Sequence, residues 1–427
     1  MPKDARPDHT RELFPIESVQ KLPTRLSGFL DQVRSFDAFG KPTQVEYVDG
    51  LHTLPIAYHT NEFWTSKQRD AHSIHEVSYR ACFKPQLPAF FIDRLTEPGD
   101  IVHDPFTGRG TTLVEAALLE RVPSGNDANP LSKILTQPRL DPPDLEAILE
   151  RLDSLDLDGY SGPLESFLIP FYHPETARHI HALRNNLLSK ADGGTADGVD
   201  SWIQMVATNR LTGHSPGFFS VYTMPPNQAV TADRQRLINV KRSQVPPIRD
   251  VKAIIAKKTQ ALLKDIAHKR PEAKTEDAIR HQSADETYPL KKNSVALVVT
   301  SPPFIDTVDY KTDNWLRCWF NGIDPNSIDF WQFRKPEDWV EAMLSTLRAL
   351  HRILKPGGVV AFEVGEVRKG KILLEQLLLP HLHTTGLHPL MVMVNQQDFT
   401  KTANTWGVHN KTAGTNTNRI LVLFKPE

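Results

Sequence analysis

The sequence predicts an α/β protein built on a doubly wound sheet, interrupted by a largely helical insertion at about residues 140–280. The first observation is that apolar segments of strand length alternate with amphipathic segments of helix length on both sides of this insertion. Such alternation is typical of a mostly parallel sheet with helices on both faces. The second observation is a strand, a glycine-containing loop and a helix in direct succession at residues 101–120, which is the beginning of a βαβ unit.

The segments before the insertion can be assigned in chain order. Residues 1–70 are polar with scattered prolines, and we treat them as an N-terminal extension with one helix at Leu26–Phe36. Pro85–Leu95 predicts a helix with its apolar side chains on one side, which the Pro98-Gly99 turn follows. Ile101–Asp104 is then the first predicted strand of the sheet.

The segments after the insertion predict the rest of the sheet and its covering helices. The apolar run Ser294–Val299 predicts a buried strand. A long helix over residues 336–354 follows, and the glycine pair at 357–358 ends it. The remaining predictions are a strand at Val359–Val364, a helix at Leu373–Leu382 and two closing strands at Leu390–Val394 and Arg419–Phe424.

Composition limits the kind of protein. Of the 427 residues, 39% are hydrophobic and 24% are charged, which is enough for a packed core. The net charge is −1, so a surface that binds phosphates must be local. No apolar run reaches the roughly 18 residues of a membrane span, and the N-terminal residues lack a signal-peptide core. Because Cys82 and Cys318 are the only cysteines, we expect a cytoplasmic protein without a disulfide framework, and we expect no metal.

The loop after the first strand has the features of a cofactor-binding loop. Gly108 and Gly110 allow a close backbone approach or a positive φ, and Thr111 or Thr112 can cap the following helix. Asp127 follows the glycines by about 20 residues, where an acidic side chain commonly binds ribose hydroxyls. The two glycines do not fit the G-x-G-x-x-G spacing of dinucleotide-binding loops. The prediction of a ligand site therefore depends on the strand, the loop, the helix and Asp127 together.

The stretch Thr300-Ser301-Pro302-Pro303-Phe304 follows the buried strand directly. Two prolines fix φ near −65° and remove two backbone donors, while their carbonyls still accept hydrogen bonds. A stiff, acceptor-rich turn beside an aromatic ring suits a planar substrate with an exocyclic amine. The alternative is an ordinary turn at the end of a strand.

The insertion contains a local excess of positive charge. Residues 231–280 hold 13 Lys and Arg against 6 Asp and Glu. A solvated helix face is one explanation, and a surface that contacts phosphates is the other. For the second, the candidate DNA contacts are Arg210, Lys241, Arg242, Lys257 and Lys258.

Three motifs resemble those of the amino-group DNA methyltransferases, which use S-adenosylmethionine. DPFTGRGTTLVEA is similar to the cofactor loop of that family, TSPPF to its catalytic motif, and ACFKPQLPAFFIDRLTEPGD to the segment before the cofactor loop. The resemblance covers roughly residues 72–132 and 283–424. It implies a Rossmann-like sheet of seven strands with the last strand antiparallel. Residues 71–139 and 281–427 would form this methyltransferase domain, and residues 140–280 would house DNA target recognition.

The resemblance also implies roles for individual residues. The Ser301 side chain and the Pro302 carbonyl would accept hydrogen bonds from the target amine, and Phe304 would stack on a base flipped out of the duplex. The catalytic residues would be Ser301, Pro302, Pro303 and Phe304. Asp104 would orient the methionine amine of the cofactor, Asp127 the ribose and Asp285 the adenine. The cofactor contacts would be Phe83, Lys84, Pro85, Asp104, Phe106, Gly108, Gly110, Thr111, Thr112, Asp127, Asp285 and Thr300.

The motifs leave the target base open. Serine in the catalytic motif favours cytosine N4, whereas Asp or Asn is more usual in adenine-N6 enzymes. RNA amino-methylation is an alternative, and a cofactor-binding protein that only interacts with nucleic acid is the non-enzymatic one. Cytosine-C5 chemistry is disfavoured because neither cysteine follows a proline. The expected partners are double-stranded DNA and a cognate restriction endonuclease.

Overall fold

The fold was analysed in a computed structural model of the chain. The structure describes residues 22–49, 55–65, 71–223, 229–271, 278–286, 289–305, 310–367, 371–396 and 417–427. The first part of the predicted N-terminal extension, residues 1–21, lies outside these ranges.

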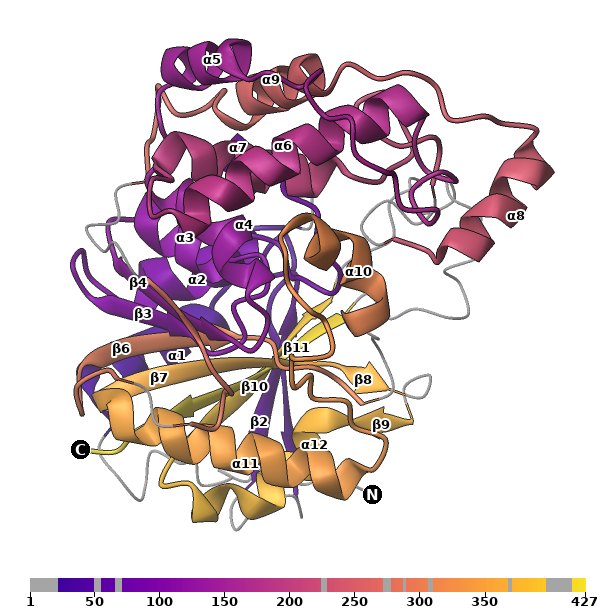
Figure 1. The fold of residues 1–427 in the computed structure, drawn as a ribbon. Helices are drawn as coiled ribbons and strands as arrows, with labels where there is room; N and C mark the ends of the chain where they lie inside the picture. The colour runs from indigo at the N-terminus through magenta and orange to yellow at the C-terminus, as the bar shows by residue number, and fades with distance from the viewer. Residues whose placement is uncertain are drawn as a thin grey trace, which may run out of the picture.

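A nine-stranded sheet runs through the middle of the molecule in the order β1-β2-β10-β11-β7-β6-β3-β4-β5 (Figure 1). Its strands are β1 (Gln44–Val48), β2 (Ile56–Asn61), β3 (Ile101–Asp104), β4 (Val122–Asp127), β5 (Ile279–His281), β6 (Val295–Thr300), β7 (Leu354–Val364), β10 (His388–Gln396) and β11 (Thr417–Phe424). The strands from β5 to β7 are all parallel, and β11 is antiparallel to both β7 and β10. The predicted doubly wound sheet with an antiparallel last strand is therefore confirmed.

Burial explains why the central strands read as continuous apolar runs. Every residue of β6 is buried, because helices cover both faces of a parallel sheet. β7 is longer than the predicted Val359–Val364, since Leu354 already pairs with Val295. A register shift separates this pair from the main ladder, and the turn there includes Gly357 at φ +74°.

The N-terminal extension contributes two strands that were not predicted. β1 and β2 form an antiparallel pair, and β2 joins the sheet parallel to β10. β1 is an exposed edge strand without a buried face. Val45 and Tyr47 alternate with polar residues, but this alternation is confined to a five-residue strand and both side chains are exposed. The predicted helix of this region is present as α1 (Thr24–Arg34).

Helices cover the sheet in layers (Figure 1). On one face, α1 and α2 (Gln86–Leu95) pack on β6 and β7. On the other face, α11 (Pro336–Ile353), α12 (Leu374–Leu378) and the short helix η4 (Leu379–Thr384) contribute the core. The predicted helices at 85–95, 336–354 and 373–382 are therefore confirmed. In the described part of the chain, no helix is long and apolar enough to cross a membrane.

The insertion forms an outer layer of helices over α3 (Thr111–Leu118) and α4 (Leu131–Leu140) (Figure 1). Its helices are α5 (Leu145–Ser154), α6 (Pro174–Asp192), α7 (Gly198–Arg210), α8 (Ala232–Arg242) and α9 (Val251–Leu262). These helices share a single apolar core with α3, α4 and α10 (Tyr310–Phe320), and α8 lies at its margin with Gln235 as its one buried residue.

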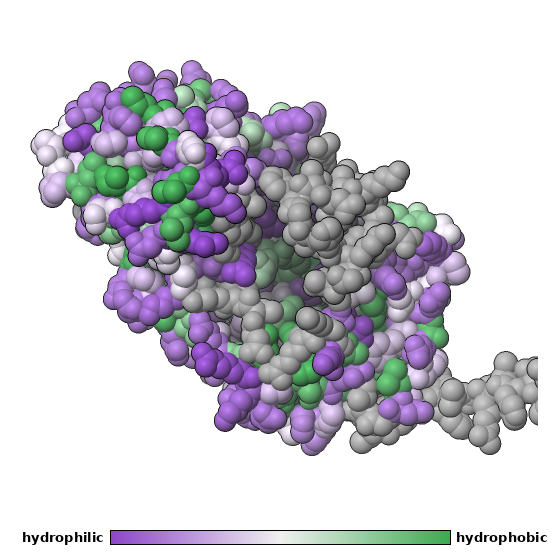
Figure 2. Space-filling view, turned by 90° about the vertical axis from the view of Figure 1, so that its right-hand side faces the viewer, coloured by the Kyte–Doolittle hydropathy of each residue, from purple (hydrophilic) through white to green (hydrophobic). Residues whose placement is uncertain are grey.

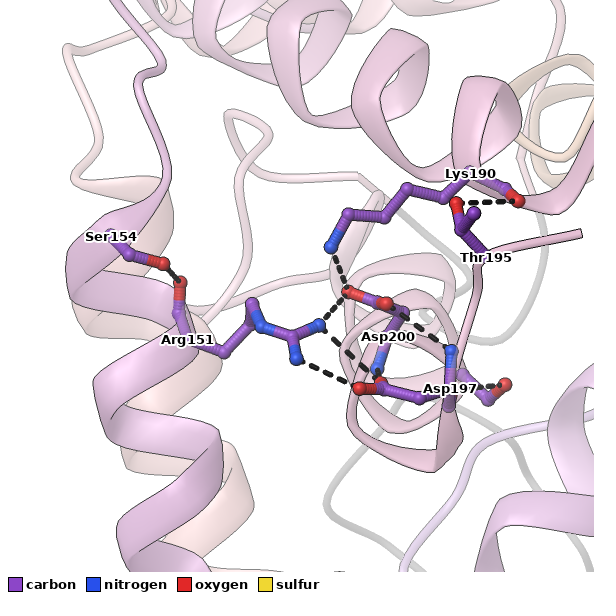
Figure 3. A network of polar contacts seen from close by, with 7 residues as sticks. Arg151, Ser154, Lys190, Thr195, Asp197 and Asp200 are labelled. Atoms are coloured by element: carbon purple, nitrogen blue, oxygen red, sulfur yellow. Dashed lines mark hydrogen bonds and ion pairs between the residues drawn. The ribbon is translucent and has the colours of Figure 1, made fainter. Parts of the chain in front are cut away.

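A network of charges joins three helices of the insertion (Figure 3). Arg151 of α5 donates to the Asp197 carboxylate at 2.8 Å and to the Asp200 carboxylate at 2.5 Å. Lys190 of α6 also donates to Asp200, at 2.8 Å. The two aspartates form the capping box of α7, so one cluster caps this helix and fastens it to α5 and α6.

Replacing Asp200 with alanine should destabilise the insertion. Its side chain is 4% exposed and accepts from two cations, which would lose a buried partner. We expect a loss of about 2 kcal/mol in the free energy of unfolding, measured by chemical denaturation. Asp153→Ala, at an exposed position of α5, is the matched control and should change stability by no more than about 0.5 kcal/mol. Equal effects of both substitutions would contradict this role.

Hydrogen bonds from Arg151 also hold the pKa of Asp197 at about 2. The stabilisation that the Asp197 carboxylate contributes to the free energy of unfolding should therefore be present above about pH 4 and lost as the pH falls towards 2.

Candidate active site

A pocket lies at the carboxyl ends of β3, β4 and β6. Its walls come from residues 79–83, 104–108, 127–129 and 283–284, and from Ser301, Pro303 and residues 330–331. Parallel strands bring these ends to one edge of the sheet, where ligands of doubly wound proteins bind. The pocket therefore brings the glycine loop, Asp127 and the proline turn together, as the sequence predicted. On the face shown in Figure 2, the surface is hollowed between the upper and lower parts of the molecule, with hydrophobic residues visible inside.

Asp104 connects the two loops that the motifs singled out. The Thr300 hydroxyl donates to its carboxylate at 2.6 Å, and the Phe106 backbone N–H donates to the same oxygen at 3.1 Å. The Thr112 hydroxyl donates to the Val299 carbonyl at 3.0 Å, which adds a second link between the glycine loop helix and β6. Burial raises the pKa of Asp104 to about 7, although the hydrogen bonds from Thr300 and Phe106 oppose the shift.

Asp127 holds the glycine loop from the neighbouring strand. Its carboxylate accepts from the Gly108 N–H at 2.7 Å and from the Asn129 N–H at 2.8 Å. Burial raises its pKa to about 6, although these two hydrogen bonds oppose the shift. The side chain lines the pocket, where it can also accept from hydroxyl groups of a ligand.

The two glycines of the loop serve different purposes. Both have positive φ, +53° at Gly108 and +75° at Gly110. A Cβ at Gly110 would lie 2.1 Å from the Thr136 side chain, so this glycine allows α3 to approach α4. A Cβ at Gly108 would meet Cys82 Sγ only at 3.5 Å, beside the pocket. Close approach to a ligand is therefore a role for Gly108, whereas Gly110 is explained by packing.

The segment before α2 reaches the pocket through Phe83. Lys84 and Pro85 come next and lead into α2, but they do not line the pocket. Burial lowers the pKa of Lys84. The buried Arg109 holds this segment in place by donating to the carbonyls of Val77 at 2.9 Å and Phe83 at 3.1 Å. The sequence analysis missed this arginine, although it lies between the two glycines of the loop.

The predicted adenine contact lies beside the pocket and does not line it. Asp285 is exposed, and its carboxylate accepts from the Ser283 hydroxyl at 2.5 Å. Ser283 and Ala284 are the residues of this loop that line the pocket. The opposite wall includes Trp331, whose ring lies 5.9 Å from that of Phe106. Trp331 is in an irregular segment, and no motif in the sequence marked it.

Hydrogen bonds orient the proline turn. The Trp339 indole N–H of α11 donates to the Pro303 carbonyl at 2.8 Å, so that carbonyl already has a donor inside the protein. The Phe304 ring packs against Gly365, the residue that follows β7. A Cβ at Gly365 would lie only 2.5 Å from this ring. Ser301 lines the pocket, whereas the neighbouring Pro302 is buried.

Glu363 of β7 is the hydrogen-bond partner of the Ser301 side chain. No local sequence pattern identified this residue. It is 8% exposed and hydrogen-bonds to the Ser301 side chain. The Asn418 amide on β11 donates to the same carboxylate at 2.7 Å. Burial raises the pKa of Glu363, and the two hydrogen bonds oppose that shift. A hydroxyl that donates to Glu363 keeps its lone pairs available towards the pocket.

The five candidate DNA contacts separate into two groups. Arg210 is 9% exposed, donates to Asn209 and lies 4.0 Å over the Phe218 ring, so its guanidinium is used inside the protein. Lys258 donates to Glu76 at 3.2 Å. The exposed residues are Lys241, Arg242 and Lys257, with Arg242 lying over a tyrosine ring. A direct phosphate contact is therefore expected only of these three.

The described residues contain no group of three or more His, Cys, Asp or Glu side chains arranged to hold a metal ion. The chemistry of the pocket is that of the buried Asp104 carboxylate, the partly buried Asp127 carboxylate, a glycine loop and a hydroxyl on a proline turn.

Fold and pocket together define a doubly wound α/β protein with a ligand site at the carboxyl edge of the sheet. The DNA methylase family model matches residues 35–131. The Type II methyltransferase M.MjaII of Methanocaldococcus jannaschii is 33% identical over 82 residues, which cover 19% of this chain and 15% of the relative. These matches, together with the three motifs, show that part of this chain is similar to DNA methylases, and the chain spans only a small part of the curated relative.

Solved structures of some methyltransferases are similar at a low level. A proposed DNA modification methylase from Thermus thermophilus, solved with S-adenosylmethionine, is 19% identical with a TM-score of 0.20, covering 33% of this chain and 51% of that one. The rRNA methyltransferase aviRa from Streptomyces viridochromogenes is 10% identical with a TM-score of 0.31, covering 84% and 93%. Similarity of this size carries no argument about activity, substrate or partners.

Alanine at the two loop glycines should separate packing from ligand binding. Gly110→Ala combines a left-handed backbone with a collision against Thr136, so we expect a loss of about 2–5 kcal/mol in the free energy of unfolding. Gly108→Ala should cost only about 1–2 kcal/mol, because its Cβ has room. Thr136→Ala should recover part of the Gly110→Ala loss and none of the Gly108→Ala loss. Equal losses in a denaturation series would refute this distinction.

Proposed function

We propose that this protein is a DNA methyltransferase that modifies the exocyclic amine of a base, with cytosine N4 as the first candidate. The observation that carries the proposal is the meeting of Ser301 with the glycine loop and Asp127 in one pocket. Serine in the proline turn favours cytosine, and adenine N6 is the second candidate. The expected partners are double-stranded DNA and a cognate restriction endonuclease.

The pocket fits S-adenosylmethionine by its chemistry. Asp104 and Asp127 are carboxylates whose charged forms are disfavoured by burial, and a ligand with a positive charge and hydroxyl groups would stabilise them. Asp104 would hold the methionine amine, Asp127 the ribose hydroxyls, and Gly108 the close backbone approach. We assign the adenine wall to Ser283, Ala284 and neighbouring Asp285. When bound, S-adenosylmethionine supplies an electrophilic methyl group.

The remaining chemistry belongs to the proline turn. An exocyclic amine is a poor nucleophile because its lone pair is delocalised into the base. Ser301 Oγ and the Pro302 carbonyl would accept hydrogen bonds from this amine and favour a pyramidal nitrogen. Glu363 would position the Ser301 hydroxyl, and Phe304 would stack on a base that has left the duplex. Residues 140–280 would carry target recognition.

Ser301→Ala combined with Phe304→Ala should abolish methyl transfer. The double variant removes an acceptor and the stacking surface, so the rate with labelled S-adenosylmethionine and duplex DNA should fall about 100-fold or more. Ser294→Ala, at the other end of β6, is the matched control and should keep its activity. Full activity in the double variant would remove the proline turn from catalysis, and label found only in RNA would support the alternative substrate.

Glu363→Gln should slow methyl transfer without weakening cofactor binding. The raised pKa of Glu363 means that it gains a proton at a higher pH than an ordinary glutamate, and the neutral carboxyl is then a weaker acceptor for the Ser301 hydroxyl. The rate of the wild-type protein should therefore fall on acidification, starting above the usual glutamate range near pH 4.3. The variant should have a kcat about 10-fold lower and lack this acidic limb. Glu366→Gln is the control, and an unchanged pH profile in Glu363→Gln would exclude the positioning role.

A further inference from the structure

A second pocket lies between α10 and the beginning of α8, outside the candidate active site. Its volume is about 720 Å³, which is within the range of ligand pockets. Three aromatic rings form its walls, those of Phe167, Trp315 and Trp319. Thr231, Lys311 and Asp324 are exposed residues that also line it.

The rings present apolar faces and have little hydrogen-bonding capacity left. Phe167 stands almost perpendicular to both tryptophans, at 83° to Trp315 and 84° to Trp319, with ring centroids 5.4 and 6.0 Å away. The Trp315 indole N–H donates to the Val230 carbonyl at 3.2 Å, and that of Trp319 to Glu165 at 3.3 Å. All three rings are only partly buried. A ligand would therefore meet flat hydrocarbon surfaces, which favours a planar molecule.

The chain places this pocket close to the proposed chemistry. α10 follows the proline turn after a short connection. The same helix carries Asp313, which forms an ion pair with Arg80 of the active-site pocket. Trp315 and Trp319 are four positions apart, so they lie on one side of α10, while Leu316 and Phe320 are buried in the core of the insertion.

The charge beside the pocket favours a polyanion. α8 begins at the pocket with Ala232 and contains four cationic side chains against one acidic residue, Asp233. Arg236 pairs with Asp233, and Arg234 and Lys241 are further exposed cations on this helix. Lys311 and Asp324 balance each other within the pocket. This arrangement combines a neutral aromatic slot with a basic helix, as at sites that bind single strands by stacking bases and contacting phosphates.

We propose that the Phe167–Trp315–Trp319 pocket binds an unstacked DNA base other than the one that is methylated, while α8 contacts the neighbouring phosphates. This inference rests on the proposed function, because flipping one base out of a duplex leaves its partner base unpaired. The pocket would hold the opened strand while Ser301 faces the target.

Photocrosslinking and affinity measurements test this pocket directly. A short single-stranded DNA that contains 5-iodouracil should crosslink to the peptide with Trp315 and Trp319. Trp315→Leu and the milder Phe167→Leu should weaken binding of the same strand, measured by fluorescence anisotropy, by about 5- to 150-fold. Phe39→Leu is the matched control, because Phe39 is an aromatic residue that is 46% exposed in the N-terminal region.

The outcomes separate this inference from the proposed function. Retained S-adenosylmethionine binding in the variants would show that they are folded. Weakened DNA binding with unchanged cofactor binding supports the pocket. Three results would overturn the proposal for this pocket. They are an unchanged DNA affinity in both variants, crosslinks confined to the active-site pocket, and weaker binding of RNA or peptides while DNA binding is unaffected. If the wild-type protein transfers methyl groups and both variants bind DNA as tightly as the wild type, the proposal for this pocket is refuted and the proposed function stands.

Discussion

The hydrogen bond between Thr300 and Asp104, at 2.6 Å, is the contact on which the rest of the site depends. It joins the ends of β6 and β3, which are neighbours in the sheet but are separated in the chain by the whole insertion. Because the two strands are parallel, the glycine loop and the proline turn leave the sheet at one edge. The insertion, with helices α5 to α9 among its described residues, can then lie between them in sequence without moving either loop.

Three carboxylates lie at this contact or in the adjoining loops and strands, and burial raises the pKa of each of them. Asp104 connects the loops, Asp127 holds the glycine loop, and Glu363 supports Ser301. Such groups are costly to bury unless hydrogen bonds or a cationic ligand stabilise their charged forms. Their concentration beside one pocket is typical of a functional site, and a purely structural turn would not require it.

Local patterns predicted the parts of the fold that local physics determines. The buried strand β6, the helix α11 and the glycine loop all have apolar periodicity or turn residues that identify them. β1 was missed because an exposed edge strand has no buried face. Glu363 and Trp331 were missed because only the folded chain brings them to the proline turn and to Phe106. Arg210 was interpreted as a surface cation, and its burial over Phe218 depends on packing between distant segments.

The central claim is that the pocket transfers a methyl group to an exocyclic amine in DNA. The most direct test is to incubate the purified protein with duplex DNA and S-adenosylmethionine that carries a labelled methyl group. The DNA is then digested to nucleosides, and the labelled nucleoside is identified by mass spectrometry. We predict label on an exocyclic amine, as N4-methylcytosine, which the serine of the proline turn favours, or as N6-methyladenine. Label only at carbon 5 of cytosine, or no label in DNA although the protein binds the cofactor, would contradict the account.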